Sequence, residues 1–348
     1  MDIDIDGELS VLDDGWGCGI VSLGLGYYTS KSEIETSRMT SPKYRLITRS
    51  DFDGVASAAL LKELDLIDEI LFVHPKDMQD GKIQVTERDI TTNLPYVPNV
   101  HLAFDHHASE TLRIYDTPEN HIIEANAPSA TRVVYNYFGG KMKFPNISQE
   151  MMIAVDKSDS AQFTLDDILY PKGWVLLSFL MDSRTGLGRF KEFSISNYEL
   201  MMKLVDVCAK SPIEEILEMP DVKERVELYF AQEELFKNQL QRCGTVQDHL
   251  VTIDLRQEEV IYAGNRFMVY ALFHNCNISM HILWGLNRQN TVFAVGKSIL
   301  NRTNYTNVGE LMLRFGGGGH VGAGTCQIPN EQAQQVQEQL TKLLIAQD

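Results

Sequence analysis

The first half of the chain alternates short apolar runs with helical patterns. The apolar runs do not alternate strictly with polar residues, which is typical of strands buried on both faces of a parallel sheet. Helical patterns follow some of these runs, as at Val55–Leu64 and Thr131–Phe138. The order of elements predicts an α/β domain. Its expected strands are Tyr44–Thr48, Glu69–His74, Asp89–Asn93, His101–Phe104 and His121–Glu124.

The second half is helical at first and then returns to strands. Residues 148–243 end in a long charged helix at Asp221–Arg242. Helices are also expected near Asn307–Arg314 and from about Asn330 onwards. The further expected strands are His249–Leu255, Phe267–Phe273, Ile278–Gly285, Thr291–Lys297 and Gly324–Ile328.

These patterns predict an α/β fold in which a parallel-sheet domain is joined by a helical connector to a smaller mixed α+β domain. The predicted boundaries are 41–205 for the first domain, 206–245 for the connector and 246–348 for the second domain. Residues 1–40 form a predicted peripheral extension. The extension is acidic and then broken by glycines, so it lacks the basic start and apolar core of a signal peptide.

Composition and charge narrow the class of protein. The 348 residues are 44% apolar and 23% charged, which is typical of a globular protein large enough for two domains. A net charge of −17 favours short substrates over long nucleic acids, which such a chain would repel. The five cysteines form no Cys-x-x-Cys pair, which predicts free thiols and a cytoplasmic location. No apolar run is long enough to predict a membrane span.

Carboxylates and imidazoles follow the predicted strands of the first domain. Asp51 and Asp53 stand where the first strand turns into a helix, so both can face a cation beyond the strand end. Asp105-His106-His107 follows the fourth strand, and Asp159 lies in the segment Val-Asp-Lys-Ser-Asp-Ser-Ala-Gln-Phe. Divalent Mn²⁺ and Mg²⁺ prefer carboxylate oxygens, and Mn²⁺ also accepts imidazole. The first domain is therefore predicted to hold a divalent metal centre.

The second predicted domain carries a glycine-rich motif, Phe-Gly-Gly-Gly-Gly-His, at residues 315–320. Glycine lets backbone N–H groups approach an anion closely, so Gly316, Gly317, Gly318 and Gly319 are predicted to form an anion-binding loop that ends at His320. The metal centre and this loop together predict an enzyme that cuts phosphate esters between two domains.

These four motifs, in this order over residues 42–330, resemble the DHH/DHHA1 phosphoesterase superfamily. The superfamily includes nanoRNases, 3′-phosphoadenosine 5′-phosphate phosphatases, cyclic-dinucleotide phosphodiesterases, single-strand exonucleases and exopolyphosphatases. The resemblance implies a DHH domain, a substrate-binding DHHA1 domain and an active site in the cleft between them. Relatives often form homodimers.

The resemblance also implies a role for each matching residue. His106 is the implied metal ligand, Asp105 a ligand or its orienting partner, and His107 a donor or general acid at the scissile phosphate. Asp159, in the segment Asp-Ser-Ala-Gln-Phe, matches a further carboxylate of the superfamily's metal site. Lys297-Ser298, with Asn301 soon after, matches an Arg-Ser pair of relatives that contacts substrate, so Lys297, Ser298 and Asn301 are expected at the substrate.

Two positions depart from the pattern of the superfamily. Arg49 stands where many metal-binding relatives carry a histidine, and Asn93 stands where they carry a bridging aspartate. One Mn²⁺ or Mg²⁺ ion is therefore better supported than two, held mainly by Asp53, His106 and Asp159. Arg49 is expected to contact phosphate directly, since a guanidinium suits bidentate binding.

The predicted function is metal-dependent hydrolysis of phosphate esters in short nucleotides, such as oligoribonucleotides, linear dinucleotides or 3′-phosphoadenosine 5′-phosphate. One alternative is an exopolyphosphatase. Another is a catalytically weak nucleotide sensor, because Arg49 and Asn93 replace metal ligands. The segment Arg184–Arg189 adds phosphate contacts or serves as a hinge, and the sequence leaves both readings open.

Overall fold

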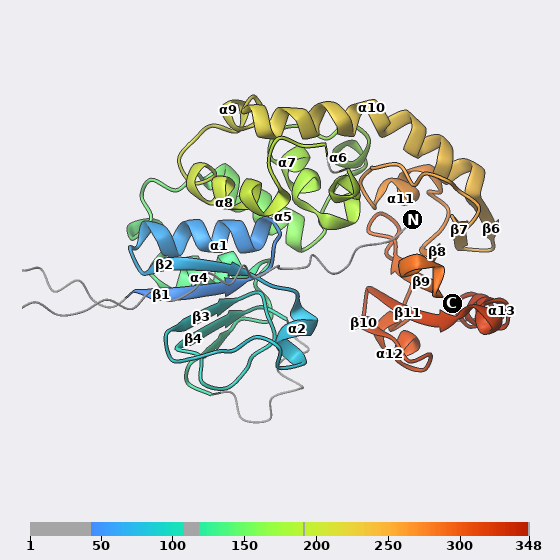
Figure 1. Cartoon of the computed structure of the whole chain (residues 1–348), viewed down its shortest axis with the longest axis horizontal. Coiled ribbons are helices and arrows are strands. Elements are labelled where there is room, and N and C mark those ends of the chain that lie inside the picture. Colours follow the sequence, from blue (N-terminus) through green and yellow to red (C-terminus); the bar gives the residue numbers. More distant parts are fainter. Residues whose placement is uncertain (1–42, 108–117, 191, 347–348) are drawn as a thin grey trace, which may run out of the picture. The chain divides into compact units, whose positions relative to one another are not determined.

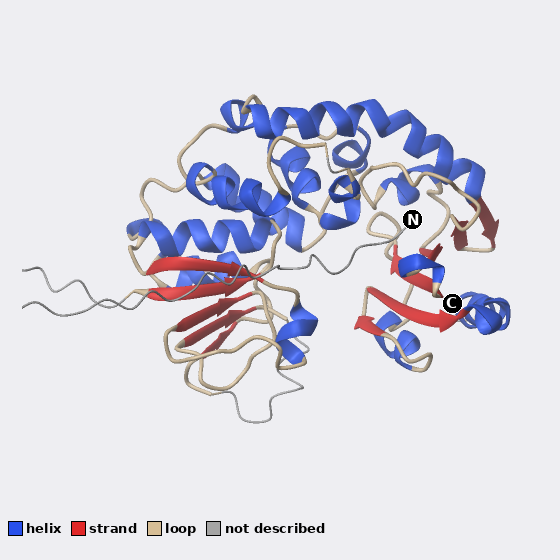
Figure 2. Cartoon of the chain, viewed as in Figure 1, coloured by secondary structure: helices blue, strands red, loops and turns tan. Residues whose placement is uncertain are grey.

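The computed structural model describes residues 43–107, 118–190 and 192–346 (Figures 1 and 2). The predicted extension at 1–40 lies outside the described residues. The described part of the chain belongs to one compact unit. Within it, a parallel sheet, a group of helices and a mixed sheet follow one another along the chain.

The first sheet is entirely parallel, with the strand order β2-β1-β3-β4-β5. Its strands are β1 (Tyr44–Thr48), β2 (Ile67–Phe72), β3 (Asp89–Thr92), β4 (Leu102–Asp105) and β5 (His121–Ile123). Helices α1 (Phe52–Glu63) and α2 (Pro75–Gln79) lie between strands along the chain, and α4 (Ala130–Tyr137) follows β5. The five predicted strands are all present, with ends displaced by at most two residues.

Burial on both faces of this sheet explains its continuous apolar strands. Leu46 packs in the large core that includes α1, whereas its neighbour Ile47 packs in a separate cluster with Met78 of α2. Successive residues of a strand point to opposite faces, so β1 must be apolar at both positions. Helix α1 also packs against α4, and Ser57 shares a hydrogen bond of 2.9 Å with Thr131 there.

The middle of the chain is helical, as predicted. Its helices are α5 (Gln149–Asp159), α6 (Leu165–Leu169), α7 (Gly173–Met181), α8 (Asn197–Val207), α9 (Ile213–Leu217) and α10 (Pro220–Cys243). Helices α5 and α8 pack against α1. Helix α10 begins with a proline at its first position, where no intrahelical N–H bond is lost, and its range confirms the long charged helix.

The second sheet is mixed, with the order β10-β11-β9-β8-β7-β6, and only its β7–β8 pair is parallel. Its strands are β6 (Gly244–Gln247), β7 (Leu250–Asp254), β8 (Ile278–Trp284), β9 (Asn290–Lys297), β10 (Gly318–His320) and β11 (Ala323–Pro329). The accompanying helices are α11 (Met268–Leu272), α12 (Val308–Leu313) and α13 (Ala333–Ile345). Leu250 and Val251 enter different apolar clusters, so this sheet too is buried on both faces.

The expected strand at Phe267–Phe273 is wrong, because this segment forms the short helix α11. An unbroken apolar run of this length does not distinguish a buried strand from a buried helix. Just before α11, the side-chain oxygen of Asn265 accepts a hydrogen bond of 3.2 Å from the N–H of Phe267. Among the helices described in 43–107, 118–190 and 192–346, none is long and apolar enough to cross a membrane.

Candidate metal centre and active site

The candidate site lies where the strand order of the parallel sheet reverses. From β1 the chain proceeds to β2 on one side, and β3, β4 and β5 then follow on the other side. At such a switch point the carboxyl ends of adjacent strands leave a crevice in which ligands bind. Arg49 and Asp51 follow β1, Asn93 follows β3, and His106 follows β4. The topology therefore brings the predicted motifs to one edge of the sheet.

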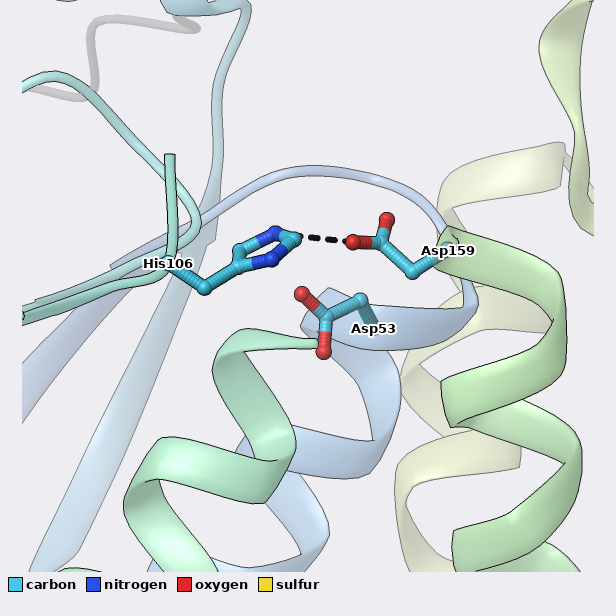
Figure 3. A group of neighbouring side chains, drawn as sticks. All are labelled: Asp53, His106 and Asp159. Carbon is cyan, nitrogen blue, oxygen red and sulfur yellow. Dashed lines mark ion pairs between the residues drawn. The ribbon is translucent and has the colours of Figure 1, made fainter. Parts of the chain in front are cut away.

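Three side chains converge at this edge, as Figure 3 shows for Asp53, His106 and Asp159. One ligand atom from each lies within 4.8 Å of the others. Asp53 comes from the first turn of α1, His106 from the loop after β4, and Asp159 from the last residue of α5. These are the three residues on which the sequence places the better supported ion.

Asp53 is buried and connects two helices. Its carboxylate accepts hydrogen bonds from the backbone N–H groups of Ala130 at 3.0 Å and Thr131 at 2.8 Å, at the start of α4. Unpaired N–H groups and the helix dipole stabilise a negative charge there. Burial nevertheless raises the pKa of Asp53 to about 7, with the nearby carboxylates of Asp159 and Asp51 adding to the rise and His106 opposing it.

His106 is held in one orientation by the backbone. Its Nδ1 lies 3.2 Å from the carbonyl oxygen of Ala127, so an N–H at Nδ1 would leave Nε2 as the ligand atom. Nε2 lies 2.8 Å from Oδ2 of Asp159. This contact is an ion pair when the imidazole is protonated.

The charges of His106 and Asp159 support each other. Burial opposes the charged imidazole, but Asp159, Asp53 and Asp105 outweigh burial and raise the pKa of His106 to about 9. Burial likewise opposes the charge of Asp159, yet His106, Arg49 and His107 keep the pKa of its carboxyl below the usual value. Without a metal ion, the charged imidazole of His106 and the charged carboxylate of Asp159 therefore favour each other.

Asp105 orients the second histidine. Its Oδ1 accepts a hydrogen bond of 2.7 Å from Nδ1 of His107 and another of 2.8 Å from the backbone N–H of His106. Asp105 is almost fully buried, which fixes the ring it holds. The ring of His107 stacks on that of His320, with centroids 5.5 Å apart. The last residue of the glycine motif thus lies beside the residue predicted to act at the scissile phosphate.

Arg49 and Asp51 form an ion pair, with Nε of Arg49 3.2 Å from Oδ2 of Asp51. Asp51 is also the N-cap of α1, since its side chain accepts a hydrogen bond from the N–H of Gly54. A Cβ on Gly54 would lie 1.9 Å from the carbonyl oxygen of Arg49, which explains why glycine follows Asp53. Asp51 is outside the group of three potential ligands.

Asn93 is buried in the left-handed region, with φ of 55°, which asparagine tolerates better than most residues. Its backbone N–H donates to the carbonyl of Phe104, so Asn93 is adjacent to β4. Neither polar atom of its side chain has a hydrogen-bond partner among the described residues. Such groups are rare in folded proteins and indicate a site for a water molecule or an ion.

The glycine motif is more regular than the predicted loop. Gly318–His320 forms β10, which pairs with β11, and a Cβ on Gly317 would lie 2.0 Å from the carbonyl oxygen of Thr325. The close approach of β11 therefore requires glycine at this position. Burial, with help from His107 and Arg49, lowers the pKa of the His320 imidazole.

The predicted substrate contacts at Lys297, Ser298 and Asn301 lie beside the same motif. The backbone N–H of Lys297 donates to the carbonyl of Gly322, and its Nζ donates to the carbonyl of Thr306. The hydroxyl of Ser298 accepts hydrogen bonds from the N–H groups of Leu300 and Asn301, so it shapes the turn after β9. In this structure Lys297 and Ser298 are thus engaged with the protein.

Two contributions to the site were missing from the sequence analysis. The carbonyl of Ala127 orients His106, and the start of α4 holds Asp53. Ser129 is the N-cap of α4, but no sequence pattern indicates which carboxylate a helix end will meet. Asp156, three residues before Asp159, accepts from Ser129 at 2.7 Å and so fixes α5 against α4.

The donor set fits a divalent cation. Two carboxylates and one imidazole, all within the reach of one ion, suit Mn²⁺ or Mg²⁺ in chemistry and charge. Besides the atoms of Asn93, Oδ2 of Asp105 is also buried without a described partner. These unpaired polar atoms lie at the ends of β3 and β4, next to the group of ligands.

Comparison with known proteins assigns the family. Comparison with family models and with curated proteins gave no match. Among solved structures, the chain is 60% identical to the pGpG-specific phosphodiesterase PggH from Vibrio cholerae, with a TM-score of 0.77 over 88% of this chain and 100% of that one. The chain therefore belongs to the DHH phosphoesterase superfamily, and it is a hydrolase of phosphoric ester bonds.

More distant structures are similar as well. RecJ from Thermus thermophilus, in complex with Mn²⁺, is 12% identical with a TM-score of 0.44, over 82% of this chain and 50% of that one. CDC45 from Entamoeba histolytica is 9% identical with a TM-score of 0.49, over 87% of this chain and 95% of that one. Similarities at this level add nothing to the assignment.

Proposed function

We propose that this protein is a metal-dependent phosphodiesterase that hydrolyses linear 5′-phosphorylated dinucleotides such as pGpG. The observation that carries the proposal is the convergence of Asp53, His106 and Asp159, together with 60% identity to a phosphodiesterase specific for pGpG. Addition of water across the P–O3′ bond of such a dinucleotide yields two 5′-mononucleotides. The predicted cytoplasmic location agrees with the free thiols of Cys208, Cys243, Cys276 and Cys326.

In this proposal Asp53, His106 and Asp159 hold one Mn²⁺ or Mg²⁺ ion. When bound, such an ion activates water and offsets negative charge on the phosphoryl oxygens. His107, fixed through Nδ1 by Asp105, directs Nε2 as a proton donor to the leaving 3′ oxygen. His320 stacks on His107 and helps to keep bulk water from that ring.

Arg49 and Asn93 adapt the site to one ion. The guanidinium of Arg49 lowers the pKa of Asp159, so it lies near the ligand group and adds positive charge beside it. A neutral amide at Asn93 bridges two cations far less well than a carboxylate would. Arg49 is therefore proposed to bind a non-bridging oxygen of the scissile phosphate, in place of a second ion.

Turnover by full-length protein, freed of metal and supplied with Mn²⁺ or Mg²⁺, tests this function. The panel contains pGpG, 3′-phosphoadenosine 5′-phosphate, a cyclic dinucleotide and a short polyphosphate. We expect hydrolysis of pGpG, and a loss of at least about 100-fold in kcat/KM for Asp159→Asn, because removal of one ligand forfeits several kcal/mol of stabilisation. Asp206→Asn is the matched control, since Asp206 lies on the surface and, among the described residues, pairs only with Lys62.

The other outcomes separate the alternatives. Hydrolysis of polyphosphate in preference to pGpG would replace the proposal with an exopolyphosphatase. Tight binding of pGpG without turnover, at any concentration of Mn²⁺, would identify a nucleotide sensor instead. Full activity in Arg49→Ala would refute the role given to Arg49.

A further inference from the structure

Two arginines from separate segments share one aspartate, Asp182. Asp182 accepts a hydrogen bond of 2.7 Å from Nε of Arg184 through Oδ1, and one of 3.1 Å from Nε of Arg266 through Oδ2. Asp182 is largely buried, whereas the side chain of Arg184 is 54% exposed and that of Arg266 is 33% exposed. The trio carries a net charge of +1 and presents its positive part to solvent.

Among the described residues, both guanidinium groups of this cluster keep their terminal nitrogens free for a ligand. Asp182 is contacted through Nε of each arginine, so the terminal nitrogens of Arg184 and Arg266 have no hydrogen-bond acceptor among the described residues. By contrast, Arg189 donates to the carbonyls of Ile261 and Tyr262. Of the Gly/Arg segment singled out in the sequence, Arg184 is thus available to a ligand and Arg189 is structural.

The cluster is built on fixed backbone. The hydroxyl of Thr185 donates to the carbonyl of Phe179, and the N–H of Gly264 donates to the carbonyl of Thr185 at 3.0 Å, which joins the two segments. Asn265 is buried and donates to the carbonyl of Ile168 and to the hydroxyl of Tyr229. Hydrogen bonds to the rest of the protein therefore hold both segments that present Arg184 and Arg266.

The charges that act on Arg184 include two aspartates of the candidate active site. Burial opposes its charge, but Asp182 first and then Asp51 and Asp159 raise the pKa of the guanidinium. Burial and the neighbouring Arg184 together lower the pKa of Arg266 to about 10, which shows that the two cations repel each other. One carboxylate does not neutralise two guanidinium groups, so the pair favours a further anion.

We propose that Arg184 and Arg266, bridged by Asp182, bind the terminal 5′-phosphate of the dinucleotide substrate. This inference rests on the proposed function and extends it to the way in which the site recognises substrate length. A terminal phosphate carries up to two negative charges and three free oxygens, which two guanidinium forks can share. The scissile diester has a single charge and lies, in the proposal, with Arg49 and His107.

Two dinucleotides that differ only in the 5′-phosphate, pGpG and GpG, test the inference. Wild-type protein is expected to prefer pGpG, and Arg184→Ala to lower kcat/KM for pGpG by about 10- to 100-fold, the range of a charged hydrogen-bond pair. GpG turnover should change by less than about twofold in the same variant, since GpG lacks the group that Arg184 binds. Arg266→Ala should act in the same direction, and Arg184→Lys should retain part of the preference.

The control is Arg88→Ala. Arg88 is 56% exposed and pairs with Asp68, so its removal matches the loss of Arg184 in exposure and charge. Arg184→Ala leaves Asp182 paired with Arg266, and a thermal melt of each variant checks that the fold is retained. An equal loss on pGpG and GpG, or no loss on either, would overturn the inference.

Binding separates this inference from the proposed function. Equilibrium binding of pGpG and GpG to metal-free protein is measured beside the rates. If wild-type protein cleaves neither compound yet binds pGpG more tightly, and Arg184→Ala abolishes the difference, the proposed function fails and the phosphate site stands. If wild-type protein neither binds nor cleaves pGpG in preference to GpG, the phosphate site is wrong.

Discussion

Binding of a metal ion should release protons, because the ion and protons compete for the same atoms. In the metal-free protein the carboxylates around His106 raise its pKa to about 9, so at pH 7 its imidazole is almost fully protonated. Burial raises the pKa of Asp53 to about 7, so this carboxyl is about half protonated at the same pH. Asp159, whose pKa is lowered, is already ionised.

The magnitude follows from these three groups. At pH 7, one Mn²⁺ ion should displace about one proton from His106 and about half a proton from Asp53, or about 1.5 in total. At pH 9 the total should fall to about 0.5, since His106 is then half protonated and Asp53 is ionised. Raising the pH towards 9 removes the protons that compete with the ion at His106 and Asp53. The apparent affinity for Mn²⁺ should therefore rise by about tenfold per pH unit between pH 7 and pH 9.

Isothermal titration calorimetry in buffers of different ionisation enthalpy measures the released protons. His106→Ala should reduce the release at pH 7 to at most about one proton, from Asp53 alone, whose pKa rises further once His106 no longer lowers it. His74→Asn is the control, because His74 caps α2 with its side chain and asparagine can replace it in that role. A release near zero at pH 7, or one that His106→Ala leaves unchanged, would show that His106 is not a ligand.

Three further predictions concern the buried positions. Asn93→Asp should raise the bound Mn²⁺ from about one ion to about two ions per chain by elemental analysis, because a carboxylate at the end of β3 can bridge two ions. Gly317→Ala should lower the free energy of unfolding, measured in urea, by about 3 kcal/mol, because its Cβ would lie 2.0 Å from the carbonyl oxygen of Thr325. Gly318→Ala is the control: a Cβ there would have nothing within 4 Å, so the free energy of unfolding should change by less than about 0.5 kcal/mol. Arg225→Ala should lower the free energy of unfolding by about 3 kcal/mol, because the buried guanidinium donates to two backbone carbonyls that would lose this donor. An unchanged urea midpoint would contradict the role given to Arg225.

The sequence predicted most of the elements on which the site depends. β1 and the long helix α10 follow from apolar runs and from proline and glycine at their ends. The convergence of Asp53, His106 and Asp159 was predicted from the motifs and their resemblance to a superfamily, and the structure brings these three side chains together.

The remaining features depend on contacts between distant parts of the chain. Asp53 accepts from the N–H of Thr131, 78 residues further on, and no local pattern specifies that partner. Arg266 precedes a segment that was expected to be a strand, so its place beside Arg184 was not foreseen. The roles of Asp105, His107 and the glycine motif stay predictions, since their effect on a substrate depends on chemistry beyond their positions.

The hydrogen bonds that Asp53 accepts from α4 restrict how this enzyme can change in evolution. Loss of that carboxylate would leave two buried N–H groups unpaired, so a mutation there damages folding as well as chemistry. Arg49 and Asn93, the two positions where the chain departs from its superfamily, do not hold helices together in this way. The side chain of Arg49 is partly exposed, and that of Asn93 has no hydrogen-bond partner among the described residues. Variation in metal number can therefore accumulate at Arg49 and Asn93 while α1 and α4 stay together.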